Sequence, residues 1–278
     1  MNSNTPNSTK SLSITKSGSW PTFKGIRIDG KILIDSGVSV TNVPTIASTV
    51  RANPSAGFSI VSYTGTQTSA GNGTIGHGLN AQPALVISKD RDNATPWIVQ
   101  NTSLGSNEYL ILNDTAAVSN SSSAGGGSLP KPTSSVFYGS WLSGLNTNGA
   151  DFIAYCFAPV AGYSSMGSYQ GNGSANGPFV YTGFRPRWVM IKHSSGSGNN
   201  WIIYDTARNT SNVAGLQLYP NLNAAEADAT QDSHARIDIL SNGFKLRGSH
   251  SSLNTNNETM IYIAFASNSF ASNGGLAR

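Results

Sequence analysis

Charged side chains are scarce in this chain. Asp, Glu, Lys and Arg make up 11% of its 278 residues, against about 25% in an average soluble domain. Glycine and many Ser, Asn and Thr residues stand in their place. A disordered chain would combine high net charge with few aromatic residues, but 5 Trp, 10 Tyr and 10 Phe occur here in short apolar runs between polar turns. This pattern predicts many short β-strands.

Excess positive charge is lacking outside the N-terminal part. The formal net charge is +4, and residues 1–51, with six basic and two acidic side chains, account for all of it. Residues 52–278 contain 11 basic and 11 acidic side chains and are neutral. Nucleic-acid binders concentrate Lys and Arg on one face, so nucleic acid is not an expected partner.

Cysteine and long apolar runs are lacking too. The one cysteine, Cys156, excludes an intrachain disulfide, and its apolar setting (FIAYCFA) predicts an inert core thiol. No run of 18 or more apolar residues is present, so membrane insertion is not expected. The polar N-terminus lacks the apolar stretch of a secretory signal. We therefore expect a protein made in a cytoplasm.

An internal repeat runs through the sequence. Residues 145–158 (LNTNGADFIAYCFA) match residues 253–266 (LNTNNETMIYIAFA) without gaps, at an offset of 108. Further matches follow in a constant order, which predicts a duplicated module. They are GFSIVSYTG (57–65) with GYSSMGSYQG (162–171, one insertion), PALVISK (83–89) with PRWVMIK (186–192), WIVQ (97–100) with WIIY (201–204), and YLILN (109–113) with LQLYP (216–220).

The predicted fold class is all-β: two tandem, duplicated, antiparallel β-sandwich modules of jelly-roll type, preceded by an extended N-terminal arm with a β-hairpin. Residues 1–56 form the arm, 57–161 module 1 and 162–278 module 2. Apolar runs rich in Val, Ile and aromatic residues are typical of strands. We expect strands at 58–63, 84–89, 97–100, 109–112, 152–158, 178–182, 187–192, 201–205, 215–219, 236–240, 243–247 and 259–266.

Two local signals lie in the second module. Asn242-Gly243, between IDIL and FKLR, is the strongest short hairpin signal in the chain. Helical apolar spacing is not sustained over eleven residues anywhere in the modules, and the nearest candidate for a helical turn is Ala224–Asp232.

The N-terminal 56 residues differ from the modules. Pro6 and the surrounding Ser, Thr and Asn residues are typical of an arm or linker. Asp29-Gly30 separates two short apolar runs, which predicts one hairpin. A lone two-stranded hairpin is marginal in water, so we expect it to pack on the first module or a neighbouring chain, for anchoring or assembly. The residues expected to form this assembly surface are Phe23, Ile26, Ile28, Ile32 and Ile34.

Catalytic, cofactor-binding and metal centres are not predicted. The histidines lack a partner at metal-ligand spacing; His77 (GHG) is typical of a turn, and His193 is expected at the exposed end of a strand. Asp90 and Asp92 (DRDN) resemble a minimal calcium turn but lack the Gly and terminal Glu of an EF-hand loop. The equivalent loop of the second module (HSSGSGNN) has no acid. A solvated hairpin tip is the main hypothesis and calcium the alternative.

Carbohydrate binding is the ligand-binding function that the sequence leaves open. Exposed aromatic rings flanked by Asn, Asp and Ser form platforms for sugars. Trp97 and Trp201 are repeat-equivalent and, like Trp188, lie in apolar strands, which favours the core. Trp141 (FYGSWLSG) has no counterpart and is the candidate glycan-binding residue; interface or core packing is its alternative.

Several motifs together resemble a known module. GFSIVSYTGT, GHGL, GSYQGNGSANGPFVYTGFRPRWVMIK, LSNGFKLR and IYIAFASNSF, within residues 52–270, are similar to a module repeated in tail-fibre and other virion proteins of marine tailed phages of the cyanophage type. FKGIRIDGKILIDSG also resembles the closing strands of a concanavalin-like sandwich that precedes the module in longer proteins. The resemblance implies location in the virion and carries over no catalytic residue.

The expected function is that of a non-enzymatic structural component of a tailed-phage virion, exposed as a tail fibre, spike or capsid-decoration subunit. Expected partners are further copies of the chain and other virion proteins. The alternative is an adhesin that binds a host-surface glycan. A glycan-degrading enzyme is disfavoured, because a glycosidase needs two carboxyl groups about 5–10 Å apart and the 13 acids are scattered. Cofactors are not expected.

Overall fold

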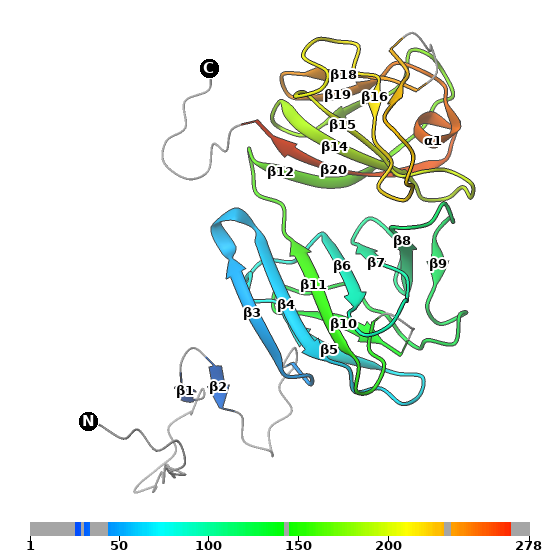
Figure 1. The fold of residues 1–278 in the computed structure, drawn as a ribbon. Coiled ribbons are helices and arrows are strands. Elements are labelled where there is room, and N and C mark those ends of the chain that lie inside the picture. The colour runs from blue at the N-terminus through cyan, green and yellow to red at the C-terminus, as the bar shows by residue number, and fades with distance from the viewer. Residues whose placement is uncertain (1–25, 29–30, 34–43, 142–144, 231–234, 268–278) are drawn as a thin grey trace, which may run out of the picture. The chain divides into compact units, whose positions relative to one another are not determined.

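The computed structural model describes residues 26–28, 31–33, 44–141, 145–230 and 235–267. Their secondary structure is β-strands in several antiparallel sheets, with one short α-helix and one 3-10 turn, so the all-β class is confirmed (Figure 1). The chain divides into two units, residues 1–41 and residues 42–278, which are described separately. Within the described ranges, no helix has the length and apolar character to span a bilayer.

The N-terminal unit contains the predicted hairpin. Strand β1 (Ile26–Ile28) pairs antiparallel with β2 (Lys31–Leu33). Of the residues expected to form the assembly surface, Ile26, Ile28 and Ile32 lie on these strands, whereas Phe23 and Ile34 lie outside the described residues.

The first half of the larger unit is built on a seven-stranded sheet of order β3-β4-β11-β6-β7-β8-β9. The central strand β11 (Asp151–Phe157) lies between β4 (Phe58–Thr64) and β6 (Leu85–Asp90). A second sheet pairs β5 (Asn72–Gly76) with β10 (Val136–Ser140). The remaining strands are β3 (Ser48–Asn53), β7 (Ile98–Asn101), β8 (Glu108–Ile111) and β9 (Ser119–Asn120), and the turn η1 (Pro54–Ala56) joins β3 to β4.

Alternation along the strands builds the core between these two sheets. On β4 and β11, every second side chain is buried. The Tyr63 ring stacks on Phe152 of the large sheet, with ring centroids 5.2 Å apart, and meets the edge of Phe137 from the small sheet at 6.0 Å. The two sheets therefore pack face to face.

The large sheet begins inside the stretch that the sequence assigned to the arm. Strand β3 pairs along β4, with Ser48 opposite Tyr63, and Ile46 is buried in the core. Because β3 is an edge strand with mostly exposed side chains, its polar sequence shows no apolar alternation. The compact unit begins at Asn42, so residues 44–56 belong to this unit rather than to the arm.

The second half has a four-stranded sheet of order β12-β20-β14-β15 and a three-stranded sheet of order β13-β19-β18. The central strand β20 (Thr259–Ala266) lies between β12 (Ser164–Gln170) and β14 (Pro186–His193). Phe244 of the small sheet meets Tyr262 of the large sheet edge-on, with ring centroids 5.6 Å apart. The other elements are β13 (Phe179–Tyr181), β15 (Ile202–Asp205), β16 (Leu216–Gln217), β17 (Ala227–Asp228), β18 (Ile237–Leu240), β19 (Gly243–Leu246) and α1 (Ser251–Asn254).

Every strand predicted in the modules is present, with ends within two residues of the prediction. The helical turn at Ala224–Asp232 is wrong: the described part of that segment contains β17, which pairs with β16. The hairpin of β18 and β19 is confirmed, but its turn lies one residue earlier, since Leu240 is opposite Gly243. A Cβ atom on Gly243 would lie 2.1 Å from the carbonyl oxygen of Val180. Glycine is therefore needed there because it lets β13 pack closely against β19.

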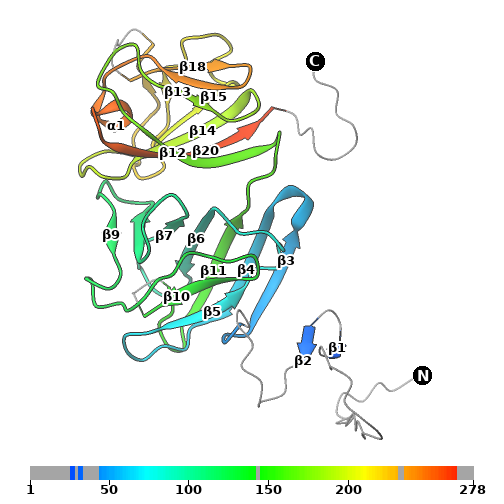
Figure 2. The ribbon, with the colours of Figure 1, turned by 180° about the vertical axis from the view of Figure 1, so that it is seen from behind.

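The two halves share a third core between their large sheets. Side chains that point away from each half's own core, among them Leu85, Val99 and Ile263, form one cluster around the fully buried Trp201. The Trp201 Nε1–H donates to the carbonyl oxygen of Ile111 at 2.9 Å. Both views show β12 and β20 on the side of the second half that faces the first (Figures 1 and 2). The shared core thus covers the outer face of β6 to β8 in the first half and of β14 and β20 in the second.

Replacing Trp201 with Phe should destabilise the protein because it removes the hydrogen bond from the indole N–H to the carbonyl oxygen of Ile111. We expect the free energy of unfolding to fall by about 1–3 kcal/mol, measured by urea denaturation. The matched control is Trp97→Phe at the repeat-equivalent position, where the half-buried ring stacks on Tyr155 with centroids 6.5 Å apart. Equal losses in the two variants would contradict a special role of the shared core.

Candidate functional site

Trp141, the candidate glycan-binding residue, lies directly after β10 with 41% of its surface exposed. Its backbone N–H is shared between the carbonyl oxygens of Gly71 and Gly126, both at 3.0 Å. The backbone is therefore held by two glycine-containing loops while the indole faces solvent. This exposure is what a sugar platform requires.

The other tryptophans considered for sugar binding are more buried. Trp201 lies wholly within the shared core. Trp188 is half-buried at the edge of the same cluster, with its ring centroid 5.7 Å from that of Phe265. Trp97 is half-buried against Tyr155. The core assignment is thus confirmed fully for Trp201 and in part for the other two.

Asp90 and Asp92, the calcium candidates, brace their own loop. Asp90 is buried, and its Oδ1 accepts the N–H groups of Asp92 and Asn93 at 2.9 and 3.0 Å. Asp92 Oδ2 accepts the N–H of Asp151 at 2.7 Å. In the described part of the chain, no three His, Cys, Asp or Glu side chains lie close enough together to hold a metal ion. The geometry is that of a hairpin tip tied to the start of β11.

Two lysines at repeat-equivalent positions hold the loop that follows their strand. Lys89 Nζ donates to the carbonyl oxygen of Asn93 at 2.8 Å, and Lys192 Nζ to that of Asn199 at 2.9 Å. Lys192 is fully buried and also donates across the shared core to Thr115 at 3.2 Å. Burial lowers the pKa of Lys192 to about 8, although the nearby charge of Asp114 acts in the opposite direction.

His77, predicted in a turn, and His193, predicted at the exposed end of a strand, are both buried. His77 does lie in a turn, but inside the protein: its Nδ1 accepts the N–H of Leu79, and its Nε2 is 3.1 Å from the carbonyl oxygen of Thr133. His193 lies at the end of β14 with Nε2 3.8 Å from a Glu258 carboxylate oxygen, and neither ring nitrogen is hydrogen-bonded. Burial lowers the pKa of both imidazoles. The sequence placed His193 at an exposed end because it does not show the loop that folds back over that end.

Cys156 is fully buried on β11, as predicted. Burial raises the pKa of its thiol to about 12, so the thiolate that would act as a nucleophile is not formed at neutral pH.

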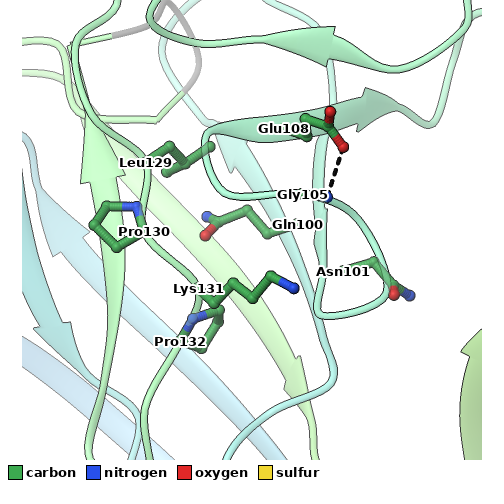
Figure 3. Close-up of a pocket in the computed structure, with 8 residues that line it drawn as sticks. All are labelled: Gln100, Asn101, Gly105, Glu108, Leu129, Pro130, Lys131 and Pro132. Atoms are coloured by element: carbon green, nitrogen blue, oxygen red, sulfur yellow. Dashed lines mark hydrogen bonds between the residues drawn. The ribbon is translucent and has the colours of Figure 1, made fainter.

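A small hollow of about 10 Å³ lies beside the end of β7. Figure 3 shows the Gln100 side chain between Leu129 and Lys131, and the Glu108 carboxylate bonded to the N–H of Gly105 at 2.6 Å. Gln100 Nε2 donates to Tyr138, but the buried Oε1 has no partner. A volume of roughly 10–15 Å³ holds one water molecule, so this hollow fits a structural water rather than a ligand.

A larger hollow of about 260 Å³ lies beside β15 and β16 in the second half. Sequence reasoning missed it because its walls come from separate segments. The one available signal was Gln217, a glutamine inside the apolar run around β16. The polar lining of the hollow consists of Asn200, Gln217, Tyr219, Asp228, His250 and Ser252.

The model of a family described as a domain of unknown function (DUF7483) matches residues 34–269. Comparison with curated proteins and with solved structures gave no match.

The stability of the protein should rise with pH through Lys192. Its pKa falls from 10.5 to about 8 on folding, so between these values the unfolded chain binds more protons than the folded one. We expect the free energy of unfolding to increase from pH 7.5 to 9.5, measured by urea denaturation. The increase should be lost in Lys192→Met and kept in the repeat-equivalent Lys89→Met. An unchanged slope in Lys192→Met would contradict this assignment.

Proposed function

The chain belongs to the DUF7483 family, and we propose that it is a non-enzymatic structural component of a tailed-phage virion, exposed as a tail fibre, spike or capsid-decoration subunit. The observation that carries the proposal is the shared core, which joins the outer faces of the two large sheets. This arrangement makes one firmly packed body out of a charge-poor chain, as a passive building block requires. The motif resemblance to phage tail-fibre modules supports the location.

The proposal includes the duplication: the halves are two copies of one jelly-roll-like sandwich module. In support, the last strand of each half lies inside its large sheet between equivalent neighbours: β11 lies between β4 and β6, and β20 lies between β12 and β14. Equivalent tyrosines also make the same bond: Tyr63 Oη donates to the carbonyl oxygen of Leu145 at 2.6 Å, and Tyr169 Oη to that of Leu253 at 2.8 Å.

The repeated LNTN motif has one structural role in both halves, which also supports duplication. Asn146 Oδ1 accepts the N–H of Thr66 at 2.9 Å, and Asn254 Oδ1 accepts that of Asn172 at 2.7 Å. The motif thus ties the start of the last strand to the end of the first. Shortly after the motif, the backbone of each half takes the left-handed conformation that Gly and Asn tolerate, at Gly149 (φ 78°) and Asn257 (φ 60°).

The N-terminal unit is proposed as the attachment device. Residues 1–41 are the smaller of the two units, and they hold five basic and two acidic side chains. A two-stranded hairpin gains stability when it packs on another surface, and a neighbouring subunit or virion protein supplies one.

Removing residues 1–41 should dissolve the oligomer without unfolding the body, because β3 and the cores are retained. We expect light scattering to give a defined oligomer for the full chain and a monomer for the truncated chain, with cooperative unfolding in both. The matched control removes only residues 1–20, before the hairpin. A monomeric full chain would overturn self-assembly through this unit.

Location is tested separately on purified phage particles from a lysate in which the chain is produced. Mass spectrometry should find its peptides in the particles after density-gradient separation. Peptides confined to the soluble fraction would overturn the virion assignment.

An adhesin that binds a host-surface glycan is the alternative function. The exposed ring of Trp141 and the polar hollow of the second half favour it. Binding of the full chain to a glycan array would support this alternative, and a blank array together with no binding to host cells would remove it.

A further inference from the structure

The hollow beside β15 and β16 is large enough for a small ligand. Its volume of about 260 Å³ is just below the roughly 300–1,000 Å³ of pockets for drug-sized molecules. β15 and β16 form one wall, and β17 and the start of α1 form others. The small side chains of Ala227, Ala229 and Ala235 leave the space open.

The corresponding place in the first half is filled. Val99 lies opposite Leu110, and Ile203 lies opposite Leu218, so Tyr109 occupies the position that Gln217 has in the second half. There Ile98, Tyr109, Leu129 and Leu145 form an apolar cluster. The open, polar space is therefore a feature of the second half and not a by-product of the fold.

The polar wall of the hollow is fixed in place. Gln217 is buried, its Nε2 donates to Tyr204 Oη at 3.0 Å and to the carbonyl oxygen of Ala235, and its Oε1 accepts the Tyr219 hydroxyl at 2.6 Å. Asn200 Oδ1 accepts from Asn221 Nδ2 at 2.8 Å, which leaves the Asn200 amide hydrogens as donors. Groups held in this way lose little conformational freedom on binding.

The lining offers both donors and acceptors. His250 Nδ1 accepts the N–H of Ser252 at 3.2 Å, so Nε2 carries the proton of the neutral ring and serves as a donor. Asp228 Oδ1 accepts from the backbone N–H and the hydroxyl of Thr230 at 2.8 and 2.5 Å. These bonds lower the pKa of the Asp228 carboxyl, and its Oδ2 accepts no hydrogen bond from the described residues, which leaves it as an acceptor for a ligand.

We propose that this hollow binds one ring of a neutral saccharide. Sugar hydroxyls both donate and accept, which matches the mixed lining, and the half-buried Tyr219 ring supplies an apolar surface. The described lining residues include no Lys or Arg, and the Asp228 carboxylate repels a carboxylate or sulfate on a sugar. The inference deepens the adhesive alternative and places the glycan away from Trp141, independently of self-assembly.

The test screens the full chain on arrays of neutral, amino and acidic glycans and measures the affinity of the hits by calorimetry. Asp228→Asn keeps Oδ1 for Thr230 but exchanges the free acceptor for a donor, and Ala227→Leu fills the space without removing a polar group. We expect each to weaken binding of a neutral glycan at least about tenfold, with little change in melting temperature. The control Trp141→Ala should leave the affinity unchanged.

Three results would overturn the proposal: no glycan bound by the native chain, preference for acidic glycans, or binding that survives both hollow variants. Loss of binding only in Trp141→Ala would keep the adhesive function and move its site to the first half. An oligomer on light scattering together with a blank array would keep the structural role and remove the saccharide site.

Discussion

Burial of the two large sheets against each other is the constraint on which the rest of the structure depends. Side-chain alternation gives each strand two rows, and on β6 and β20 each row enters a different core. On β6, Val86 enters the core of the first half, while Leu85 and Ile87 enter the shared core. On β20, Tyr262 and Ile263 divide in the same way. Strands covered on both faces have nearly continuous apolar sequences, which a solvent-facing sheet would not tolerate.

This constraint explains which strands could be predicted. Central strands such as β14 and β20 have apolar runs that mark them in the sequence. The edge strand β3 has one row in water, and the edge strand β12 consists mainly of small and polar residues, so neither has an apolar run. In the small sheet, β5 is glycine-rich because a Cβ atom on Gly73 would lie 2.5 Å from the Ile46 side chain. The close approach of the Ile46 side chain to the β5 backbone therefore requires glycine in place of the apolar alternation that usually identifies a strand.

The candidate site was predictable only in part. Exposure of Trp141 was predicted because this residue has no counterpart in the second module. The hollow of the second half was hidden by an alignment one residue out of register, which matched Tyr109 with Leu216. Asn113 and Asn221 both accept the N–H of the tryptophan that opens the neighbouring strand, at 2.9 and 3.1 Å, and this correct register pairs Tyr109 with Gln217. Only this register shows that a polar residue, Gln217, takes the place that Tyr109 has in the apolar cluster of the first half.

The place of β11 and β20 in their sheets also decides when each half is able to fold. Each is the last strand of its half in sequence and the central one in space. Phe157 of β11 pairs with Phe58 of β4, roughly 100 residues earlier. During synthesis, β4 can pair with β3 and β6 with β7, but the two hairpins are joined only when β11 has left the ribosome. Each half then closes in a single late step, and its apolar strands need protection from aggregation until that point.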